Sequence, residues 1–390
     1  MMKRVGVVTA TRAEYGLLKN TIEQINCDNE LELVLIVTGT HLLESYGNTI
    51  NEIVEDGYKI DEKVDFFMAS NDFGGICKSI GMASILFSDV FLRNKLDMLV
   101  VLGDRYELLP ICTVAMNACI PIAHISGGEA TEGAIDEVIR HCVTKMSYLH
   151  FTSCEIYRKR VIQLGEHPDR VFNFGDVGVE NIKKMNLLTR EELGKDLGMD
   201  LSRPYFSVTF HPVTLEHNSV EEQTMEMLNA IKELKEYKFI FTKSNADIGG
   251  SVINEMIDDF VKKNDNCVCF ASLGIKRYLS LLKYSSGIVG NSSSGIIEAP
   301  SLKIPTVNIG NRQSGRLKAK SIIDCNPKKE DIVKAIQYSQ TDEFKKICND
   351  VENPYGEGET AYLIKETIKD FLNNNKIDLK KKFYDVEFEY

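Results

Sequence analysis

Acidic side chains at two places in the first half of the sequence could transfer protons. Asp104 and Arg105 follow an apolar run, and a Gly-Gly pair soon afterwards precedes Glu129. Glu132, Asp136 and Arg140 follow one another at intervals of four residues in a segment of helical period, so they share one helix face. Carboxylates gathered in one site push their pKa values apart, which yields an acid and a base from one residue type. Taken singly, each carboxylate more often belongs to a solvated face or a surface ion pair, so the prediction depends on their convergence.

A second kind of chemistry, the binding of phosphate, is indicated by residues 287–300. This segment combines a short apolar strand, a turn with Ser292 and Ser293, and a helix that contains Glu298. Free amides and hydroxyls at a helix N-terminus suit a diphosphate, and Glu298 could accept hydrogen bonds from a ribose. Arg312, after the next strand, would supply a cation. A polar capped turn is the alternative, and the absence of Gly-Lys-Ser/Thr argues against ATP hydrolysis.

Three further polar residues gain weight from their positions next to expected strands. Arg12 stands just before a helix, where a dinucleotide-binding protein would show G-x-G-x-x-G, and it could face an anion together with the helix amides. His211 and Asn245 each follow a strand of the second half. A solvated arginine and a structural histidine are ordinary alternatives when each segment is considered alone.

The elements that must position these residues alternate along the chain. The expected strands cover residues 5–9, 33–38, 98–102, 120–125, 149–152, 205–210, 238–242, 267–270, 287–289 and 306–309. The expected helices cover residues 15–27, 76–93, 134–146, 154–164, 221–234, 253–263, 276–283 and 359–371. Continuous apolar strands that alternate with helices are typical of parallel sheets covered on both faces. The sequence therefore predicts an α/β fold with two doubly wound parallel sheets, whose ligands bind at the carboxyl ends of the strands.

The second series of strands begins after a charged stretch that follows residue 176. We therefore expect an N-terminal domain at 1–172 that carries the carboxylates and a C-terminal, phosphate-binding domain at 173–372. A lysine- and asparagine-rich tail at 373–390 should pack loosely.

Composition narrows the class of protein. The 390 residues carry a net charge of −11, which opposes general binding to nucleic acid or to an anionic membrane. The apolar stretch near the N-terminus is too short for a signal sequence, and no run approaches the roughly 20 apolar residues that span a bilayer. Ten cysteines are scattered without a Cys-x-x-Cys pair. We expect a cytoplasmic protein with reduced thiols and no structural metal.

Several motifs together resemble the hydrolysing UDP-N-acetylglucosamine 2-epimerases of bacterial sialic-acid pathways and the epimerase half of the bifunctional animal enzyme. The resemblance is nearly collinear and covers essentially the whole chain. It rests on Thr9-Ala10-Thr11-Arg12-Ala13-Glu14-Tyr15, Val37-Thr38-Gly39-Thr40-His41, Leu102-Gly103-Asp104-Arg105, Gly127-Gly128-Glu129, Phe210-His211-Pro212, Gly290-Asn291-Ser292-Ser293 and Gly310-Asn311-Arg312-Gln313. It implies a GT-B arrangement of two Rossmann-like domains with a central cleft, no NAD, no obligatory metal and a homodimer joined through the N-terminal domain.

The resemblance also implies roles for particular residues. The catalytic group comprises Asp104, Glu129, Asp136, Arg105 and His211. The UDP-sugar group comprises Arg12, His41, Asn245, Ser292, Ser293, Glu298 and Arg312. One position departs from the pattern, because Ser126 stands where some relatives carry a catalytic glutamate, and Glu129 is expected to take over that work.

The implied reaction converts UDP-N-acetylglucosamine and water into N-acetylmannosamine and UDP through a glycal intermediate. Alternatives are the same reaction on UDP-N,N'-diacetylbacillosamine, the non-hydrolysing epimerase, a glycosyltransferase and a catalytically inactive sensor. The three carboxylates argue against the last two, and free UDP would appear only with a hydrolysing epimerase.

Overall fold

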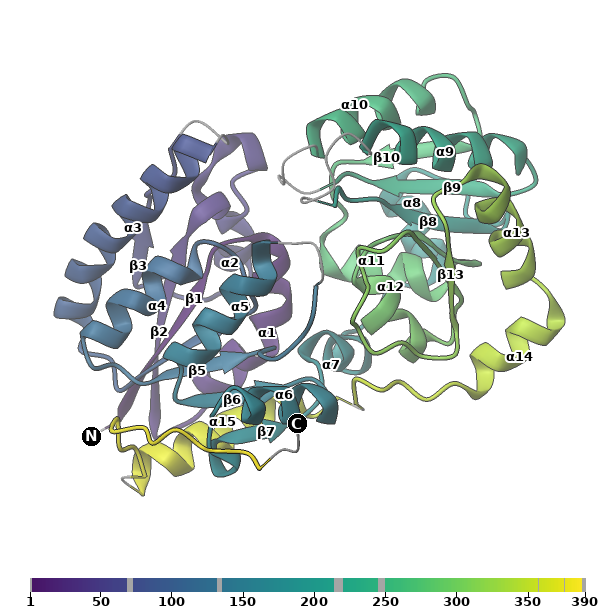
Figure 1. The fold of residues 1–390 in the computed structure, drawn as a ribbon. Coiled ribbons are helices and arrows are strands. Elements are labelled where there is room, and N and C mark those ends of the chain that lie inside the picture. The colour runs from purple at the N-terminus through teal and green to yellow at the C-terminus, as the bar shows by residue number, and fades with distance from the viewer. Residues whose placement is uncertain are drawn as a thin grey trace. The chain divides into compact units, whose positions relative to one another are not determined.

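The computed structural model describes residues 2–68, 73–131, 135–213, 220–244, 250–356, 358–374 and 376–387 (Figure 1). The chain forms two compact units. Unit 1 comprises Met1–Glu129, Asp136–Asn181 and Gly356–Tyr390, and unit 2 comprises Ala130–Ile135 and Ile182–Tyr355.

Unit 1 contains a parallel sheet of seven strands in the order β3-β2-β1-β4-β5-β6-β7. Its strands are β1 (Lys3–Thr9), β2 (Leu31–Thr38), β3 (Glu62–Val64), β4 (Met98–Leu102), β5 (Ile122–Ile125), β6 (Leu149–Thr152) and β7 (Val171–Asn173). Its helices are α1 (Arg12–Asn26), α2 (Ile50–Glu55), α3 (Phe73–Asn94), α4 (Leu108–Asn117), α5 (Ile135–Met146), α6 (Glu155–Gln163) and α15 (Thr360–Asn373), while α7 (Val177–Lys184) spans the boundary with unit 2.

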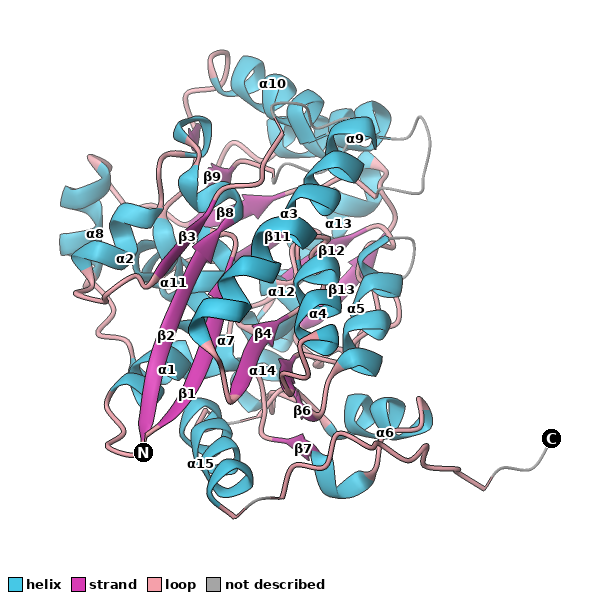
Figure 2. Ribbon diagram, turned by 90° about the vertical axis from the view of Figure 1, so that its left-hand side faces the viewer, coloured by secondary structure: helices cyan, strands magenta, loops and turns pink. Residues whose placement is uncertain are grey.

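Unit 2 contains a parallel sheet of six strands in the order β10-β9-β8-β11-β12-β13. Its strands are β8 (Tyr205–Thr209), β9 (Lys238–Thr242), β10 (Cys267–Phe270), β11 (Gly287–Gly290), β12 (Thr306–Ile309) and β13 (Ile322–Cys325). Its helices are α8 (Arg190–Leu197), α9 (Val220–Glu233), α10 (Gly250–Val261), α11 (Gly274–Lys283), α12 (Ser294–Ile297), α13 (Lys329–Ser339) and α14 (Asp342–Asp350), and Figure 2 distinguishes strands from helices throughout.

The predicted fold class is confirmed, because both sheets are parallel and alternate with helices. The physical basis is visible in β4, whose five residues are all buried. A strand covered on both faces must be apolar at every position, which is the pattern that the sequence shows. Every expected strand exists. Three short strands, β3, β7 and β13, were not expected.

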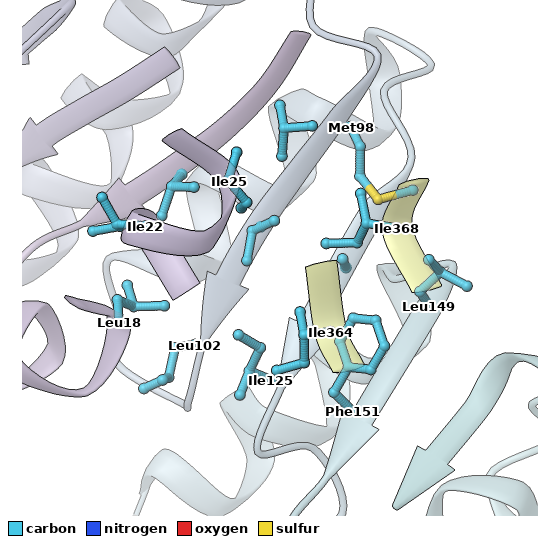
Figure 3. Packing of buried hydrophobic residues seen from close by; sticks show 14 of the residues in the cluster. Leu18, Ile22, Ile25, Met98, Leu102, Ile125, Leu149, Phe151, Ile364 and Ile368 are labelled. Carbon is cyan, nitrogen blue, oxygen red and sulfur yellow. The ribbon is translucent and has the colours of Figure 1, made fainter. Parts of the chain in front are cut away.

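The C-terminal helix corrects the expected domain boundary. We assigned residues 173–372 to the second domain, but α15 packs against α1 in the core of unit 1. Figure 3 shows Ile364 and Ile368 of α15 beside Leu149 and Phe151. The apolar residues of α15 recur every three to four positions, and burial of that stripe fixes the helix to the first core.

The tail after α15 also belongs to unit 1 and does not pack loosely at its described end. The Lys381 ammonium lies 2.8 Å from the fully buried carboxylate of Glu166. The backbone N–H of Tyr384 donates to the Gly165 carbonyl at 2.9 Å. These contacts hold the tail along the segment that precedes β7.

One helix, α3, is long and apolar enough to cross a membrane by length and composition alone. Its Ala83, Phe87, Val90 and Phe91 are buried in a core cluster of unit 1. We therefore interpret α3 as a core helix of this fold.

Candidate active site

The turn between β1 and α1 presents Arg12 at the carboxyl end of the sheet. Thr11 caps α1 by accepting a hydrogen bond from the Glu14 N–H, and the Glu14 carboxylate accepts hydrogen bonds from the backbone N–H groups of Ala10 and Thr11. Burial raises the pKa of Glu14 to about 8. Burial also lowers the pKa of the Arg12 guanidinium, and the Glu52 carboxylate opposes that shift. The buried Glu14 carboxylate thus holds the turn, and Arg12 is the first residue of α1.

His41 lies beneath this turn and is completely buried. Its Nε2 is 3.0 Å from the Thr9 hydroxyl, and its Nδ1 is 2.8 Å from the Thr49 hydroxyl. Burial lowers the pKa of His41 to about 4, so the ring is neutral at physiological pH. We predicted a substrate contact for His41, but both ring nitrogens already face hydroxyls. The geometry favours a role in holding the β1 turn.

The predicted catalytic residues Asp104 and Arg105 follow β4 in the expected position. Asp104 forms an ion pair with Arg140 of α5, and its side chain remains 26% exposed. Arg105 instead points to the buried Glu107, whose carboxylate lies 3.3 Å from the Arg105 Nε. The Asp104 carboxylate is therefore partly accessible and paired with a buried guanidinium.

The guanidinium of Arg140 connects Asp104 with the loop after β5. Arg140 is 1% exposed, and its Nη1 donates to the Glu129 carbonyl at 2.8 Å and lies 3.2 Å from Glu137. The Glu129 side chain is buried and accepts a hydrogen bond from the Ser153 hydroxyl at 3.0 Å. Two of the three predicted carboxylate residues are therefore joined through one arginine, which the sequence placed on the shared helix face but not among the site residues.

The third carboxylate, Asp136, lies in the first turn of α5 and is partly exposed. It stands one helical turn before Arg140, as the spacing predicted. A negative charge in the first turn interacts favourably with the positive end of the helix dipole.

The Gly-Gly loop that carries Glu129 depends on backbone conformations that most residues avoid. Ser126 has φ 65° and Gly128 has φ 79°. A Cβ on Gly128 would come within 2.5 Å of the Tyr157 carbonyl oxygen, so a side chain does not fit there. The loop therefore runs close to α6 and turns the chain back toward α5.

The buried His124 of β5 lies next to the Gly-Gly loop. The Nε2 of His124 lies 2.8 Å from the Gly103 carbonyl oxygen, and its Nδ1 lies 3.2 Å from the Thr144 hydroxyl. Burial lowers the pKa of His124 to about 3. Because the Gly103 carbonyl can only accept, Nε2 carries the proton, and the neutral ring ties β4 to α5.

In unit 2 the predicted residues gather around Asn291, which is 1% exposed. Its side chain accepts a hydrogen bond from the His211 backbone N–H at 2.7 Å and donates to the His211 carbonyl at 2.8 Å. Its own carbonyl accepts hydrogen bonds from Arg312 at 3.2 Å and Gln313 at 2.8 Å. Asn291 thus joins the ends of β8, β11 and β12 at one edge of the sheet.

The His211 ring lies at this edge, with its Nδ1 3.1 Å from the Ser244 hydroxyl. Asn245, the next predicted residue, lies outside the described residues. The prediction that His211 follows a strand end is therefore confirmed, because β8 ends at Thr209. The chemical role of His211 stays a prediction.

The expected phosphate loop is a tight turn followed by a helix of one turn. Ser293 is the N-cap residue of α12, and Glu298 is its C-cap residue. A Cβ on Gly290, which has φ 134°, would lie 2.0 Å from the Thr209 carbonyl oxygen. The loop can therefore approach β8 only because residue 290 has no side chain.

Tyr278 of α11 lies beside this loop, although no motif in the sequence points to it. Burial raises the pKa of Tyr278, while the neighbouring Ser294 hydroxyl opposes the rise and the Glu298 carboxylate adds to it. The residue sits in an amphipathic helix, where an aromatic side chain ordinarily indicates core packing. No local signal distinguished it.

Among the described residues, no group of three or more His, Cys, Asp or Glu side chains could hold a metal ion. The candidate residues form two sets, each described within its own unit. Unit 1 offers carboxylates and arginines, and unit 2 offers hydroxyls, amides, one histidine and one arginine.

Comparisons with known proteins agree on one family. The family model described as UDP-N-acetylglucosamine 2-epimerase matches residues 23–369. The chain is 43% identical over 344 residues, 88% of its length and 89% of the relative's, to the GDP/UDP-N,N'-diacetylbacillosamine 2-epimerase (hydrolyzing) of Campylobacter jejuni. It is 42% identical over 386 residues, 99% of its length and 98% of the relative's, to polysialic acid biosynthesis protein P7 of Escherichia coli.

The fold is shared with solved structures of lower sequence identity. The UDP-GlcNAc 2-epimerase from Neisseria meningitidis bound to UDP-GlcNAc has a TM-score of 0.80 at 18% identity, with 94% of this chain and 99% of that chain covered. The likeness supports the GT-B type of fold with two Rossmann-like sheets.

Proposed function

Because the chain belongs to the UDP-N-acetylglucosamine 2-epimerase family, we propose that it is the hydrolysing enzyme, which converts UDP-N-acetylglucosamine and water into N-acetylmannosamine and UDP. The observation that carries this choice is the similarity along 99% of the chain to a protein named for polysialic acid biosynthesis. Such a pathway requires N-acetylmannosamine as the free sugar. We expect the enzyme to act in the cytoplasm.

The proposed reaction has two stages, and both need proton transfer. In the first, a carboxylate removes the proton from C2 while the C1–O bond to UDP breaks, which leaves a glycal and free UDP. In the second, water adds its oxygen at C1, and C2 receives a proton from the opposite face. The sum is one water consumed, one UDP released and one inverted centre.

Asp104 and Asp136 are the proposed proton-transfer groups. Asp104 combines an accessible carboxylate with the fixed, buried partner Arg140. Asp136 lies one turn away on the same helix face as that arginine and is partly exposed. Glu129 is buried and its carboxylate accepts a hydrogen bond from Ser153. We therefore propose that it orients the loop at 126–129, in place of the catalytic work expected of it from the serine at position 126.

The residues at the edge of the second sheet are proposed to hold UDP. Ser292 and Ser293 would donate hydrogen bonds to the diphosphate, and Arg312 would neutralise part of its charge. His211 would donate to the same phosphates, and Glu298 would accept the ribose hydroxyls. Stabilisation of the departing diphosphate is the largest electrostatic contribution that we expect.

A second substrate is favoured by a specific observation. The Campylobacter jejuni relative, at 43% identity, is named for UDP-N,N'-diacetylbacillosamine or its GDP counterpart. That sugar differs from N-acetylglucosamine at C4 and C6, so the reaction at C1 and C2 would be the same.

Incubation of the full chain with each UDP-sugar in deuterium oxide tests the proposal. We expect free UDP and N-acetylmannosamine with deuterium at C2, both detected by NMR. The Asp104→Asn variant serves as the inactive control. If only UDP-N,N'-diacetylbacillosamine were turned over, that nucleotide sugar would be the substrate instead of UDP-N-acetylglucosamine. Interconversion of nucleotide sugars without free UDP would contradict the hydrolysing mode, and product without C2 deuterium would contradict proton abstraction.

A further inference from the structure

A cavity of about 630 Å³ lies within unit 1, between the C-terminal tail and the segment that leads into β7. One wall comes from Tyr148, which precedes β6, and from Arg170 and Phe172 at the start of β7. The other wall comes from the end of α15 and from the tail, which Figure 1 shows in yellow beside β6, β7 and α6. A space of this size suits a small organic ligand.

This cavity lies at the opposite edge of the sheet from the candidate catalytic residues of unit 1. Tyr148 and Arg170 each immediately precede a strand, whereas Asp104 and Glu129 follow β4 and β5. All seven strands are parallel, so residues before the strands and residues after them lie at opposite edges. Substrates of open α/β sheets ordinarily bind at the carboxyl edge. The cavity at the amino edge is therefore a separate place for a ligand.

The guanidinium of Arg170 is held at the cavity by a ring and not by hydrogen bonds. Its side chain is 11% exposed, and its Cζ lies 4.9 Å from the centre of the Tyr148 ring. In the described part of the chain, its Nε and Nη2 are buried without a hydrogen-bond acceptor, and Nη2 is 3.6 Å from a Glu166 carboxylate oxygen. Buried donors normally have an acceptor. A fixed cation with unused donors is thus suited to an anion.

Glu166 does not meet this need, because two lysines already neutralise it. Its fully buried carboxylate lies 2.6 Å from the Lys145 ammonium and 2.8 Å from the Lys381 ammonium. With Arg170, one carboxylate faces three permanent cations. In a chain whose net charge is −11, this is a local excess of positive charge that attracts anions.

The tail brings two further cations that take no part in holding it. Lys381 points to Glu166, while its neighbours Lys380 and Lys382 are exposed and line the cavity. Within the described residues, neither of these two side chains forms a hydrogen bond or an ion pair. They are thus available to a ligand in the cavity.

Three aspartates also line the cavity, but they do not cancel these cations. Asp370 forms an ion pair with Lys376, and the Asp378 side chain accepts a hydrogen bond from the Lys380 backbone N–H at 2.9 Å. Asp169 is 85% exposed, so water screens its charge. The charge that remains for a ligand is therefore cationic.

The inner side of the cavity is aromatic. Tyr148 and Phe371 are buried, with ring centroids 6.3 Å apart, and Phe172 meets Phe371 edge-to-face at 6.2 Å. The Tyr148 hydroxyl donates to the Lys376 carbonyl at 2.9 Å and accepts from the Asp378 N–H at 3.1 Å, which fixes the tail beside these rings. Aromatic side chains bind the flat faces of bases, so a ring joined to an anion matches both parts of the cavity.

We propose that this cavity binds a nucleoside phosphate at the amino edge of the first sheet. The phosphate contacts Arg170, Lys380 and Lys382, and the base lies against Phe172 and Phe371. Arginine and lysine together suit a phosphate group, which accepts several charge-assisted hydrogen bonds. Because the tail supplies two of the cations, the bound ligand fastens the tail to the sheet. The proposed UDP-sugar residues take no part in this site.

Hydrogen exchange of the full chain tests the site, with AMP, GMP, CMP and UMP as probes at millimolar concentration. At least one nucleotide should slow amide exchange in residues 376–384 severalfold, inorganic phosphate should slow it less, and nucleosides should leave it unchanged. The readout on the tail separates this binding from binding at the candidate UDP site.

Three outcomes of this experiment would overturn the proposal. The first is unchanged exchange of the tail with all four nucleotides. The second is equal protection by inorganic phosphate, which would show a site for a bare anion. The third is protection by phosphatidylglycerol vesicles and by no nucleotide, which would assign the lysines to a membrane surface.

The second test removes the tail cations. The double variant Lys380→Gln with Lys382→Gln changes exposed side chains and should fold normally. It should raise the dissociation constant of the most protective nucleotide roughly 10-fold or more, measured by titrating the protection of the tail, because charged hydrogen bonds are lost. Turnover of the UDP-sugar without added nucleotide should stay unchanged.

The matched control is Lys345→Gln with Lys346→Gln, which removes the same charge from two exposed lysines of α14 in unit 2. This control should bind the nucleotide as the unaltered chain does. Equal weakening in both double variants would show a general charge effect, and unchanged affinity in Lys380→Gln with Lys382→Gln would show that the tail does not contribute. Either result would overturn the proposal.

Discussion

The two units share one scaffold and differ in what stands at its edge. The strand order β3-β2-β1-β4-β5 of unit 1 corresponds position by position to β10-β9-β8-β11-β12 of unit 2. After β4 comes Asp104, which is held by Arg140. After the corresponding β11 comes Asn291, which is held by the His211 backbone after β8 and by side chains after β12. After β5 comes Glu129, and after β12 comes Arg312. Equivalent positions therefore carry acids in one unit and neutral or cationic groups in the other.

The difference shows that the parallel sheet determines where chemistry can occur and the loop residues determine which chemistry occurs. Both edges collect polar groups, because the strands end there and backbone N–H groups remain available. Among the described candidate residues, the carboxylates proposed to move protons lie in unit 1, and the hydroxyls and amides proposed to bind the diphosphate lie in unit 2. If this division is correct, substitutions in unit 1 should affect turnover, and substitutions in unit 2 should affect UDP affinity.

The largest expected effect is on turnover, from the carboxylates of unit 1. Asp136→Asn should lower kcat by roughly 10²–10⁴, the usual loss when an acid–base group is removed, with no change in melting temperature because Asp136 is partly exposed. Asp104→Asn should lower kcat similarly and also lower the melting temperature, since it breaks the ion pair with buried Arg140. UDP affinity, measured by calorimetry, should be unchanged in both. A normal kcat in either variant would remove that residue from the proposed mechanism.

Next in size is a backbone effect that separates the two edges. Gly290→Ala should destabilise unit 2 by about 3 kcal/mol, because a positive φ and a Cβ that lies 2.0 Å from the Thr209 carbonyl oxygen both oppose it. Gly103, at the corresponding end of β4, has φ 84° but open space around a Cβ. Gly103→Ala should therefore cost about 1 kcal/mol. Urea unfolding followed by unit-resolved hydrogen exchange would measure both, and equal losses would show that the two turns are equivalent.

The pH dependence of stability should come from unit 1. Burial lowers the pKa of His41 and His150 to about 4 and of His124 to about 3, so the folded state keeps them neutral while the unfolded state protonates them below about 6.5. Stability contributed by each is therefore present above pH 6.5 and is lost as the pH falls toward 4, at up to about 1.4 kcal/mol per pH unit for each group.

Glu14 acts in the opposite direction, because its raised pKa of about 8 means that the folded state holds a proton that the unfolded state releases above about 4.5. Below pH 6.5 the loss of stability from the three histidines exceeds the gain from Glu14, so acidification lowers the free energy of unfolding. Hydrogen exchange at a series of pH values should show unit 1 opening before unit 2. His41→Gln should reduce the slope, and a slope confined to unit 2 would contradict the assignment.

The smallest expected effect lies in the phosphate loop of unit 2. Ser293→Ala should raise the UDP dissociation constant severalfold, which corresponds to about 1 kcal/mol for one lost hydrogen bond, with kcat nearly unchanged. Ser285→Ala is the matched control, because the Ser285 hydroxyl donates to the Leu282 carbonyl within its own turn. Calorimetry that shows the same UDP affinity in both variants would count against the placement of the diphosphate beside Ser293.

The sequence by itself determined the α/β class, the strands of both sheets that are buried on two faces, and the turns that carry the candidate residues. These features have local causes. A doubly covered strand is apolar throughout, and the helix cap at Thr11 with Glu14 or the Gly-Gly pair before Glu129 can be recognised within a few residues. The strands that the sequence did not predict, β3, β7 and β13, all lie at sheet edges. They are short and partly polar, so they lack the continuous apolar pattern of a buried strand.

The tertiary structure alone decided which distant residues meet. Arg140 reaches back to Asp104 and the Glu129 carbonyl, Asn291 bridges β8 to the loop after β12, and α15 returns across the chain to α1. It also placed His41, which the resemblance assigned to the UDP-sugar group, in a buried position between two threonines. The physical reason is that these partners are chosen by burial and by the need to satisfy every buried polar group, and both depend on the packing of the whole unit rather than on neighbours in sequence.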